Sequence, residues 1–165
     1  MNHSTVMQIA AHSNGIPLVG LTKEFTPPTP ERVTDTVSEG RIIESFRDKG
    51  FKLDDFSFKQ EGMSEEQALA LGVAVGESYP LTFKKTVKGS DGSMTVYVHE
   101  ITGLVTKASP DNNKATEEEI WSVEGKASTY KLTVNGKVVH DINLQTQKVL
   151  MFGQDLTSKF IDAVR

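Results

Sequence analysis

Residues 130–144 read YKLTVNGKVVHDINL, two runs in which apolar and polar residues alternate on either side of Asn135-Gly136. Asparagine and glycine tolerate the positive φ angles that a two-residue turn requires, and alternation with a period of two is typical of a half-buried β-strand. The stretch therefore predicts a β-hairpin near the end of the chain, and it favours a β-rich fold for the whole.

Dipeptides of the same kind occur at Asn14-Gly15 and Asp91-Gly92. Each lies between runs rich in β-branched and aromatic residues, so each predicts a further hairpin. The first hairpin would join residues 5–11 to residues 16–25. The second leads into residues 94–106, which are apolar on both faces at first and therefore predict a central strand that is covered on both sides.

Helical signals are few. Residues 64–67 form a capping-box pattern before a short run of Ala and Leu, and Gly72 can end the helix that this pattern predicts. A second, C-terminal helix is predicted because apolar residues recur at helical spacing at Leu156, Phe160, Ile161 and Val164. Asp155 or Thr157 would cap its first turn.

The fold class that follows is mainly β. The strands and turns indicate an antiparallel β-sandwich or partly open barrel with one short helix and a C-terminal helix. Apolar residues shift phase near Gly125, which predicts one extra residue in the strand there. A chain of 165 residues is large enough to fold alone and too small to divide comfortably, so residues 1–165 are expected to form a single domain.

Composition narrows the function classes. Hydrophobic residues make up 37% of the chain and charged residues 24%, which is typical of a soluble globular protein, and no apolar run approaches the roughly 20 residues of a membrane-spanning helix. The N-terminus lacks the features of a secretory signal, so synthesis in a cytoplasm is expected. The net charge of −4 provides no basic field for tight binding of nucleic acid, and the absence of cysteine excludes disulfides and thiolate metal sites.

Catalytic motifs are absent from the sequence. The four histidines have no metal-ligand spacing, and no nucleophile elbow or phosphate-binding loop occurs. His140 and Asp141 are adjacent in a predicted strand, so their side chains point to opposite faces. Trp121 is interpreted as a core side chain rather than a stacking platform for a sugar or a partner. The sequence predicts no enzyme, no cofactor and no metal site.

Beyond these patterns, the 130–137 hairpin followed by residues 141–143 resembles the closing hairpin of phage major tail tube proteins of contractile tails. The N-terminal part is similar to the same family. Asn14-Gly15, Gly20-Leu21 and the Pro27-Pro28 break match its opening hairpin and exit.

The resemblance extends to residues 51–72, a strand that leads into a short helix where the family has them. The chain departs from the family pattern at residues 149–165. The usual second Asn-Gly turn near the end is missing there, and Val149-Leu150-Met151-Phe152-Gly153 stands in its place.

The resemblance implies a structural virion protein. Six subunits would form a ring, each giving strands to one continuous inner β-barrel, and rings would stack into a tube inside a contractile sheath. The implied partners are further copies of the chain and the tail sheath, tape measure, baseplate and tail terminator proteins, with assembly in the host cytoplasm, no membrane partner, and DNA that passes through without specific binding. A type VI secretion or bacteriocin inner tube is the first alternative, and a monomeric β-sandwich binding module is the second.

The resemblance also implies roles for two charged segments. Asp35 and Glu39, in a polar predicted strand over residues 33–39, would line the lumen and repel DNA, whereas the alternative is an ordinary exposed edge strand. Residues 38–51 would form a long loop that reaches the next ring, whereas the alternative is a solvated surface loop. The charged residues of this ring-stacking loop are Arg41, Glu44, Arg47, Asp48 and Lys49.

Overall fold

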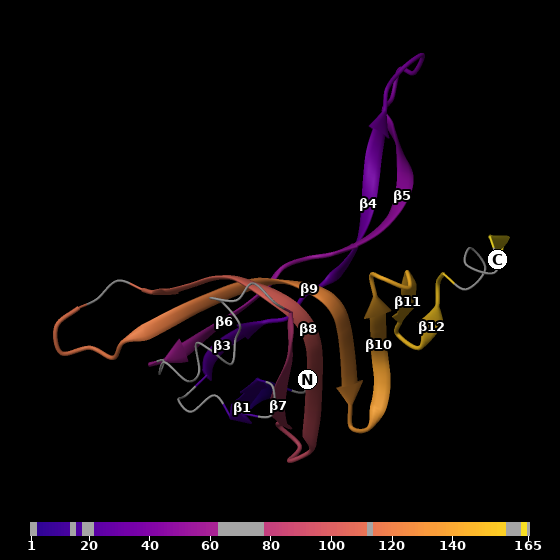
Figure 1. Ribbon diagram of the computed structural model, residues 1–165. Helices are drawn as coiled ribbons and strands as arrows, with labels where there is room; N and C mark the ends of the chain where they lie inside the picture. Colours follow the sequence, from indigo (N-terminus) through magenta and orange to yellow (C-terminus); the bar gives the residue numbers. More distant parts are fainter. Residues whose placement is uncertain are drawn as a thin grey trace.

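The computed structural model describes residues 3–13, 16–17, 22–62, 78–111, 114–157 and 163–164, and these are almost entirely β-structure (Figure 1). The strands are β1 Ser4–Ser13, β2 Ile16–Pro17, β3 Thr22–Thr26, β4 Pro30–Val37, β5 Ser45–Leu53, β6 Phe56–Glu61, β7 Tyr79–Gly89, β8 Met94–Pro110, β9 Ile120–Val134, β10 Lys137–Asn143, β11 Lys148–Met151 and β12 Gln154–Asp155. The predicted mainly β, antiparallel class is confirmed, and the sheets do not close into a barrel.

Most residues of the two predicted helices lie outside the described residues. The helix expected at residues 64–71 lies outside the described residues, as do Phe160 and Ile161 of the C-terminal helix. Asp155, one of the two expected caps, ends β12, and its Oδ1 accepts a hydrogen bond from the Thr157 backbone N–H at 3.1 Å.

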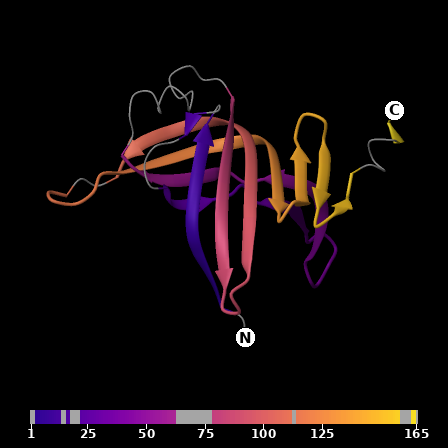
Figure 2. The ribbon, with the colours of Figure 1, turned by 90° about the horizontal axis from the view of Figure 1, so that it is seen from below.

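One antiparallel sheet has the strand order β12-β11-β10-β9-β8-β7-β1-β2, and we call it the main sheet. Figure 2 shows β1, β7 and β8 side by side within it. A small layer, the β3–β6 pair, branches from the main sheet at β9. β6 pairs with the first half of β9, over residues 120–125, and β10 pairs with the second half, over residues 129–134. β9 therefore belongs to both layers.

Two of the three predicted turns lie in the described chain. A four-residue turn over residues 90–93, which contains Asp91-Gly92, connects β7 to β8, and only Gly92 of that pair has a positive φ, 87°. Asn135-Gly136 alone connects β9 to β10, with φ angles of 48° and 82°. The Asn135 side chain also fastens its turn to the neighbouring strand, because its Oδ1 accepts a hydrogen bond from the Val96 N–H at 2.9 Å and its own N–H donates to the Val96 carbonyl at 3.0 Å. Asn14-Gly15 lies outside the described residues.

The strand partners at the N-terminus differ from the prediction. β1 pairs along its length with β7, and only the two residues of β2 pair back onto it. β3, which covers the end of the predicted 16–25 strand, pairs with β6 instead. The alternating pattern identifies strands, but it carries no information about which distant strand completes the hydrogen bonding.

β8 is central, as predicted, but the expectation that both of its faces are covered is wrong at its start. Met94 and Val96 are exposed, whereas His99 and Ile101 are buried on the other face. The start of β8 is apolar on both faces, but the described part of the chain covers only one of these faces.

The hydrophobic core lies between the main sheet and the small layer. Phe25 of β3 stacks on Phe83 of β7 with ring centroids 4.0 Å apart, and Phe58 of β6 packs against the same ring at 5.1 Å. The buried core residues are Ala11, Phe56, Phe58, Leu81, Phe83, Ile101, Val105, Val123, Ala127, Tyr130, Ile142 and Val149. Face-to-face packing of two antiparallel layers is the β-sandwich arrangement.

Two glycines allow the small layer to approach β8 and β9 closely. The Phe56 ring occupies the space where side chains of Gly103 and Gly125 would be: an added Cβ would lie 3.0 Å from the Phe56 Cε1 at Gly103 and 2.6 Å from its Cζ at Gly125. The predicted extra residue of β9 is found at Ser128, opposite the Thr102/Gly103 step, three positions beyond the expected Gly125. This bulge moves the buried face from Ala127 to Tyr130.

The atypical segment near the C-terminus forms a hairpin without the Asn-Gly pair. Phe152-Gly153 connects β11 to β12, with φ angles of 50° and 79°. The two-residue turn with positive φ at both positions is thus kept, but a bulky aromatic residue occupies a site that asparagine adopts with less strain. Phe152 is exposed, and its ring meets the edge of His140 at 4.8 Å.

Replacing Phe152 by asparagine is expected to stabilise the protein by about 0.5–1 kcal/mol, because relief of backbone strain outweighs the loss of one exposed ring contact. Urea unfolding of the variant and of Phe152→Ala measures the effect. The alanine variant loses the ring and keeps the strain, so it should not be stabilised. Equal stability of the two variants would contradict the strain argument.

Candidate functional site: an assembly surface

β4 and β5 form a separate two-stranded sheet that projects from the body of the molecule, and we call it the arm (Figure 1). The predicted long loop over residues 38–51 is too long. β5 begins at Ser45, because Ser45–Leu53 pairs residue by residue with β4. Of the predicted ring-stacking residues, Arg41 and Glu44 therefore lie in the loop at the tip of the arm, whereas the strand β5 contains Arg47, Asp48 and Lys49.

Charged residues of the arm pair with each other across its two strands. The Arg32 guanidinium binds the Asp48 carboxylate and lies over the Phe51 ring at 4.5 Å. Lys49 Nζ lies 3.4 Å from Asp35 Oδ2. Each exposed pair contributes little on its own, about 0–1 kcal/mol, but a series of cross-strand pairs holds the register of an isolated hairpin.

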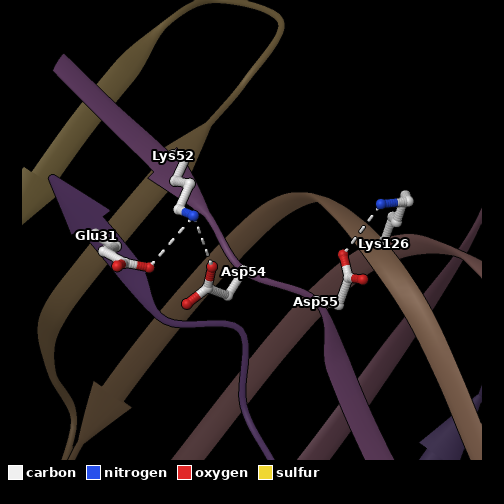
Figure 3. A network of polar contacts seen from close by, with 5 residues as sticks. All are labelled: Glu31, Lys52, Asp54, Asp55 and Lys126. Carbon is white, nitrogen blue, oxygen red and sulfur yellow. Dashed lines mark hydrogen bonds and ion pairs between the residues drawn. The ribbon is translucent and has the colours of Figure 1, made fainter. Parts of the chain in front are cut away.

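The base of the arm carries a second group of ion pairs, drawn in Figure 3. Lys52 Nζ lies 3.7 Å from Glu31 Oε2 and 3.9 Å from Asp54 Oδ1. Asp55 then pairs with Lys126 of β9 at 3.4 Å. Asp54 and Asp55, the two residues between β5 and β6, thus connect the arm to the main sheet.

Large apolar side chains are exposed at the tip of the arm. Ile42 is fully exposed, and the exposed fractions of Ile43 and Phe46 are 81% and 76%. We call these three residues the tip cluster. The sequence interpretation missed them because the stretch was treated as charged; the signal was present in the Ile-Ile pair within an otherwise polar segment.

A second exposed apolar group surrounds the end of the main sheet where β1 begins and β7 turns into β8. It comprises Val6, Met7, Met94 and Val96, and we call it the turn-end cluster. Met94 and Val96 are two residues apart on β8 and therefore share a face. Figure 1 shows this end of the sheet and the arm at opposite ends of the molecule.

Among the described residues, the main sheet has an open edge at each end of its strand order. Within the described residues, only His12 and Ser13 of β1 have a partner on the side away from β7, so Ser4–Ala11 presents an unpaired edge. At the other end, β12 is the two-residue strand Gln154–Asp155. Unpaired backbone groups on such an edge are a ready template for pairing with another chain.

A polar row crosses the middle of the main sheet on the face that points away from the small layer. A cross-strand row brings together Thr82, Glu100, Lys131 and Asp141, which also line a shallow groove. Asp141 in turn pairs with Lys148 of β11 at 3.2 Å. Acidic and basic groups alternate along the row, so the row is hydrophilic without a strong field of one sign.

The sequence-predicted lumen residues are not part of this row. Asp35 lies in β4 with its carboxylate paired to Lys49, and Glu39 lies in the turn at the tip of the arm. The predicted adjacency of the two acids in one strand is only partly found, because β4 ends at Val37.

Buried polar groups form a line through the core. His99 Nδ1 lies 2.8 Å from the Tyr130 hydroxyl, and the His140 ring follows Tyr130 with ring centroids 6.4 Å apart. Within the described residues, His99 Nε2 and His140 Nδ1 have no hydrogen-bond partner. Burial lowers the pKa of His99 to about 4, with a smaller contribution from the Lys85 ammonium, and burial also lowers the pKa of His140 and raises that of Tyr130.

No group of three or more His, Asp or Glu side chains in the described part of the chain could hold a metal ion, and no helix there has the length and hydropathy to cross a bilayer. Trp121 is half-buried and lies outside the core cluster, so its assignment to the core is wrong; its Nε1 donates to Glu119 Oε1 at 2.9 Å. The assembled features are strand edges, an arm and exposed apolar clusters.

Comparisons with known proteins point to one family and one fold. Residues 3–163 match the family described as phage tail tube protein FII. The search of curated proteins finds no match. Among solved structures, the Hcp1 protein from the E. coli EAEC 042 pathovar matches with a TM-score of 0.54 at 13% identity, covering 84% of this chain and 99% of that one.

Two further structures share the fold. A type six secretion system protein matches with a TM-score of 0.52 at 11% identity and covers 90% of this chain and 98% of its own. A chain of the anti-feeding prophage baseplate matches with a TM-score of 0.51 at 8% identity and covers 78% of this chain and 95% of its own. At these identities the likeness describes the fold.

Proposed function

Because the chain belongs to the family of phage tail tube proteins, we propose that six copies form a ring and that rings stack into the inner tube of a contractile phage tail. Membership of the family makes it a structural protein of a tail or secretion tube rather than an enzyme. In this role the protein acts through its surfaces, which must bind other copies of the chain and leave a channel open.

The observation that carries the proposal is the open edge of β1. The described residues Ser4–Ala11 offer backbone donors and acceptors on the side away from β7, and soluble monomers normally cover or shorten such an edge. If the far end of the main sheet in a neighbouring subunit pairs with β1, the edges of all six copies are satisfied in a closed ring. A continuous inner barrel follows from this pairing.

The polar face of the main sheet is the surface suited to line the channel. Its row of Thr82, Glu100, Lys131 and Asp141 alternates in charge, so neither DNA phosphates nor a translocated protein would bind to it strongly. The lumen role of Asp35 and Glu39 stays a prediction; it requires the arm to border the channel.

The remaining partners belong to the same proposal. A tube of this kind lies inside a tail sheath, encloses a tape measure protein during assembly, and ends at a baseplate and at a tail terminator. Assembly takes place in the host cytoplasm, and the finished tube belongs to the virion.

Proline substitution in β1 tests the ring. Backbone N–H groups of adjacent strand residues point to opposite edges, so of Ile9→Pro and Ala10→Pro one removes a hydrogen bond to β7 and the other removes only an outward donor. The first is expected to destabilise the monomer by about 1–3 kcal/mol, because it leaves a carbonyl of β7 without its hydrogen-bond donor. The second is expected to keep the wild-type circular dichroism spectrum and to prevent ring formation, seen by light scattering and negative-stain microscopy.

Ile9→Ala and Ala10→Val are the matched controls, because both keep the backbone N–H groups. Rings from both proline variants would show that the β1 edge is not used. A wild-type protein that stays monomeric at every concentration would favour the binding module, and genes for a secretion ATPase and membrane complex beside this gene would favour a secretion tube over a phage tail.

A further inference from the structure

We propose that Phe152 is a lid over His140 and that the two side chains form a pH-sensitive latch, which holds the β11–β12 hairpin on the main sheet at neutral pH and releases it in acid. β11 and β12 form one end of the strand order of the main sheet (Figure 2). The latch therefore controls whether this end of the sheet is complete. It lies within one subunit, so it does not depend on the proposed ring.

The first observation is the buried imidazole of His140. Only 9% of the residue is exposed, and within the described residues its Nδ1 has no hydrogen-bond partner. Its cross-strand neighbours are Leu132 of β9 and Met151 of β11, whose side chains are apolar. An imidazole in such surroundings is stable when it is neutral, whereas an added proton would create a buried charge without an acceptor.

The second observation is the backbone of Phe152. Its φ angle of 50° lies in the left-handed region, which strains a bulky aromatic residue. The ring is 76% exposed, yet it lies against His140, with ring centroids 4.8 Å apart and an angle of 77° between the ring planes. Strained residues are typical of functional positions, and the contact that this strained residue makes is with the buried imidazole. Phe152 is thus placed between His140 and water.

The attachment of the hairpin is weaker at the Phe152 end than at the other end. The Gly153 N–H donates to the Val139 carbonyl at 3.3 Å, a long hydrogen bond that is made at a bulge of β10. At the other end, the Leu144 N–H donates to the Ser128 carbonyl of β9 at 3.0 Å. The hairpin can therefore open from the Phe152 end while its other end stays attached to β9.

The titratable groups that face His140 are neutral or positive. Tyr130 of β9 is the nearest, and beyond it lie His99 of β8 and Lys85 of β7. Burial lowers the pKa of His140, and burial keeps Tyr130 neutral by raising its pKa. None of these groups would stabilise an imidazolium at position 140.

The nearby carboxylates lie on the other face of the sheet. Asp141 follows His140 in β10, so its side chain points away from the imidazole, and it pairs with Lys148 at 3.2 Å. Asp155 of β12 is opposite Leu150, which is itself opposite Asp141, so Asp155 shares that face. A proton on His140 therefore gains no ion pair from these acids, and the acceptor that opening of the lid provides is water.

Acid consequently favours the open hairpin. The closed state holds an imidazole whose pKa is lowered, whereas in the open state the ring meets water and its pKa returns toward 6.5. The closed state is thus fully stable above about pH 6.5 and loses stability as the pH falls below it. If the proposed function is correct, the same opening would remove the sheet end that pairs with β1 of a neighbouring subunit, so rings would come apart in acid.

An NMR titration of the His140 ring tests the lid. In Phe152→Ala the pKa of His140 should rise toward 6.5, because water then reaches the imidazole, whereas Phe152→Tyr keeps the ring and should titrate like the wild type. Leu144→Ala is the matched control, since it removes an exposed apolar side chain at the other end of the hairpin. An unchanged pKa in Phe152→Ala would show that Phe152 is not a lid.

Amide hydrogen exchange in the dilute full chain tests the latch. The Gly153 N–H reports on the hairpin, and the Asn135 N–H, which donates to the Val96 carbonyl at another turn, is the internal reference. Between about pH 7.5 and pH 5, the protection of Gly153 relative to that of Asn135 should fall at least about threefold in the wild type. The ratio removes the effects of pH on the exchange chemistry and on global unfolding.

His140→Leu removes the titrating group and fills its place with an apolar side chain, which a buried site without a hydrogen-bond partner tolerates. In this variant the ratio should not change with pH. A constant ratio in the wild type, or the wild-type fall in His140→Leu, would overturn the inference. Both outcomes concern single subunits and leave the proposed ring untouched, whereas a wild-type protein that never forms rings would contradict the proposed function and not the latch.

Discussion

Gly125→Ala is expected to destabilise the protein by about 3 kcal/mol. The new Cβ would lie 2.6 Å from the Phe56 Cζ and 2.7 Å from the Leu104 carbonyl oxygen. Phe56 is completely buried, and the Leu104 carbonyl is part of the backbone of β8. Neither group can move without disturbing the packing of the small layer on the main sheet. Overpacking in a dense core typically costs about 1–3 kcal/mol, and two close contacts place this site at the upper end.

Urea unfolding of the purified chain measures this loss. Lys126→Ala, at the next residue, is the matched control: its side chain is exposed and makes one ion pair with Asp55, so it should change the free energy of unfolding by less than about 1 kcal/mol. The double variant Gly125→Ala/Phe56→Leu should lose less stability than the sum of the losses of the two single variants. A stability within about 0.5 kcal/mol of wild type for Gly125→Ala would contradict the close packing described for Phe56.

The second large effect concerns pH. The pKa of His99 is lowered from 6.5 to about 4 in the folded protein, because burial disfavours the charged imidazolium. The unfolded chain therefore binds a proton near pH 6.5 that the folded chain does not bind, and stability falls as the pH decreases from about 6.5 to about 4. The expected loss is about 2 kcal/mol between about pH 7.5 and pH 5, and roughly 3 kcal/mol at pH 4.

Groups around His99 act in the same direction or do not titrate in this range. The Lys85 ammonium opposes protonation of His99, and His140, whose pKa is also lowered, adds to the loss at acid pH. Tyr130 stays neutral because its pKa is raised.

The free energy of unfolding should be measured across this pH range for the wild type and for His99→Gln. The comparison separates the contribution of His99 protonation from that of the carboxylates. The variant has lower stability at neutral pH and a flatter dependence between about pH 7.5 and pH 5. If the two curves are parallel, His99 does not carry the pH dependence.

The parts of the fold that the sequence predicts are those in which neighbouring residues decide the structure. At Asn135-Gly136 and Asp91-Gly92, two small residues meet the backbone requirement of a turn, and the flanking strands pair with each other directly. The turn at Phe152-Gly153 was not predicted, because the tertiary structure imposes the same backbone on a residue that does not prefer it.

Other features depend on contacts that a pattern does not record. β1 pairs with β7, more than sixty residues away, and alternation within either strand gives no hint of that choice. The start of β5 was missed because Phe46 and Phe51 lie among charged residues, whose cross-strand pairing stabilises a hairpin that has no core of its own. For the same reason the sequence interpretation emphasised the charged residues of the arm, and the exposed apolar residues at its tip were overlooked.

The position of β9 has a mechanical consequence for a subunit of a tube. Its backbone is hydrogen-bonded to β8 along one side, and to β6 and then β10 along the other. Pulling either neighbour away would break hydrogen bonds of the same strand, so we expect the main sheet and the small layer to unfold as one cooperative unit. A mechanical load on the subunit would therefore meet a stiff element at β9 instead of a hinge.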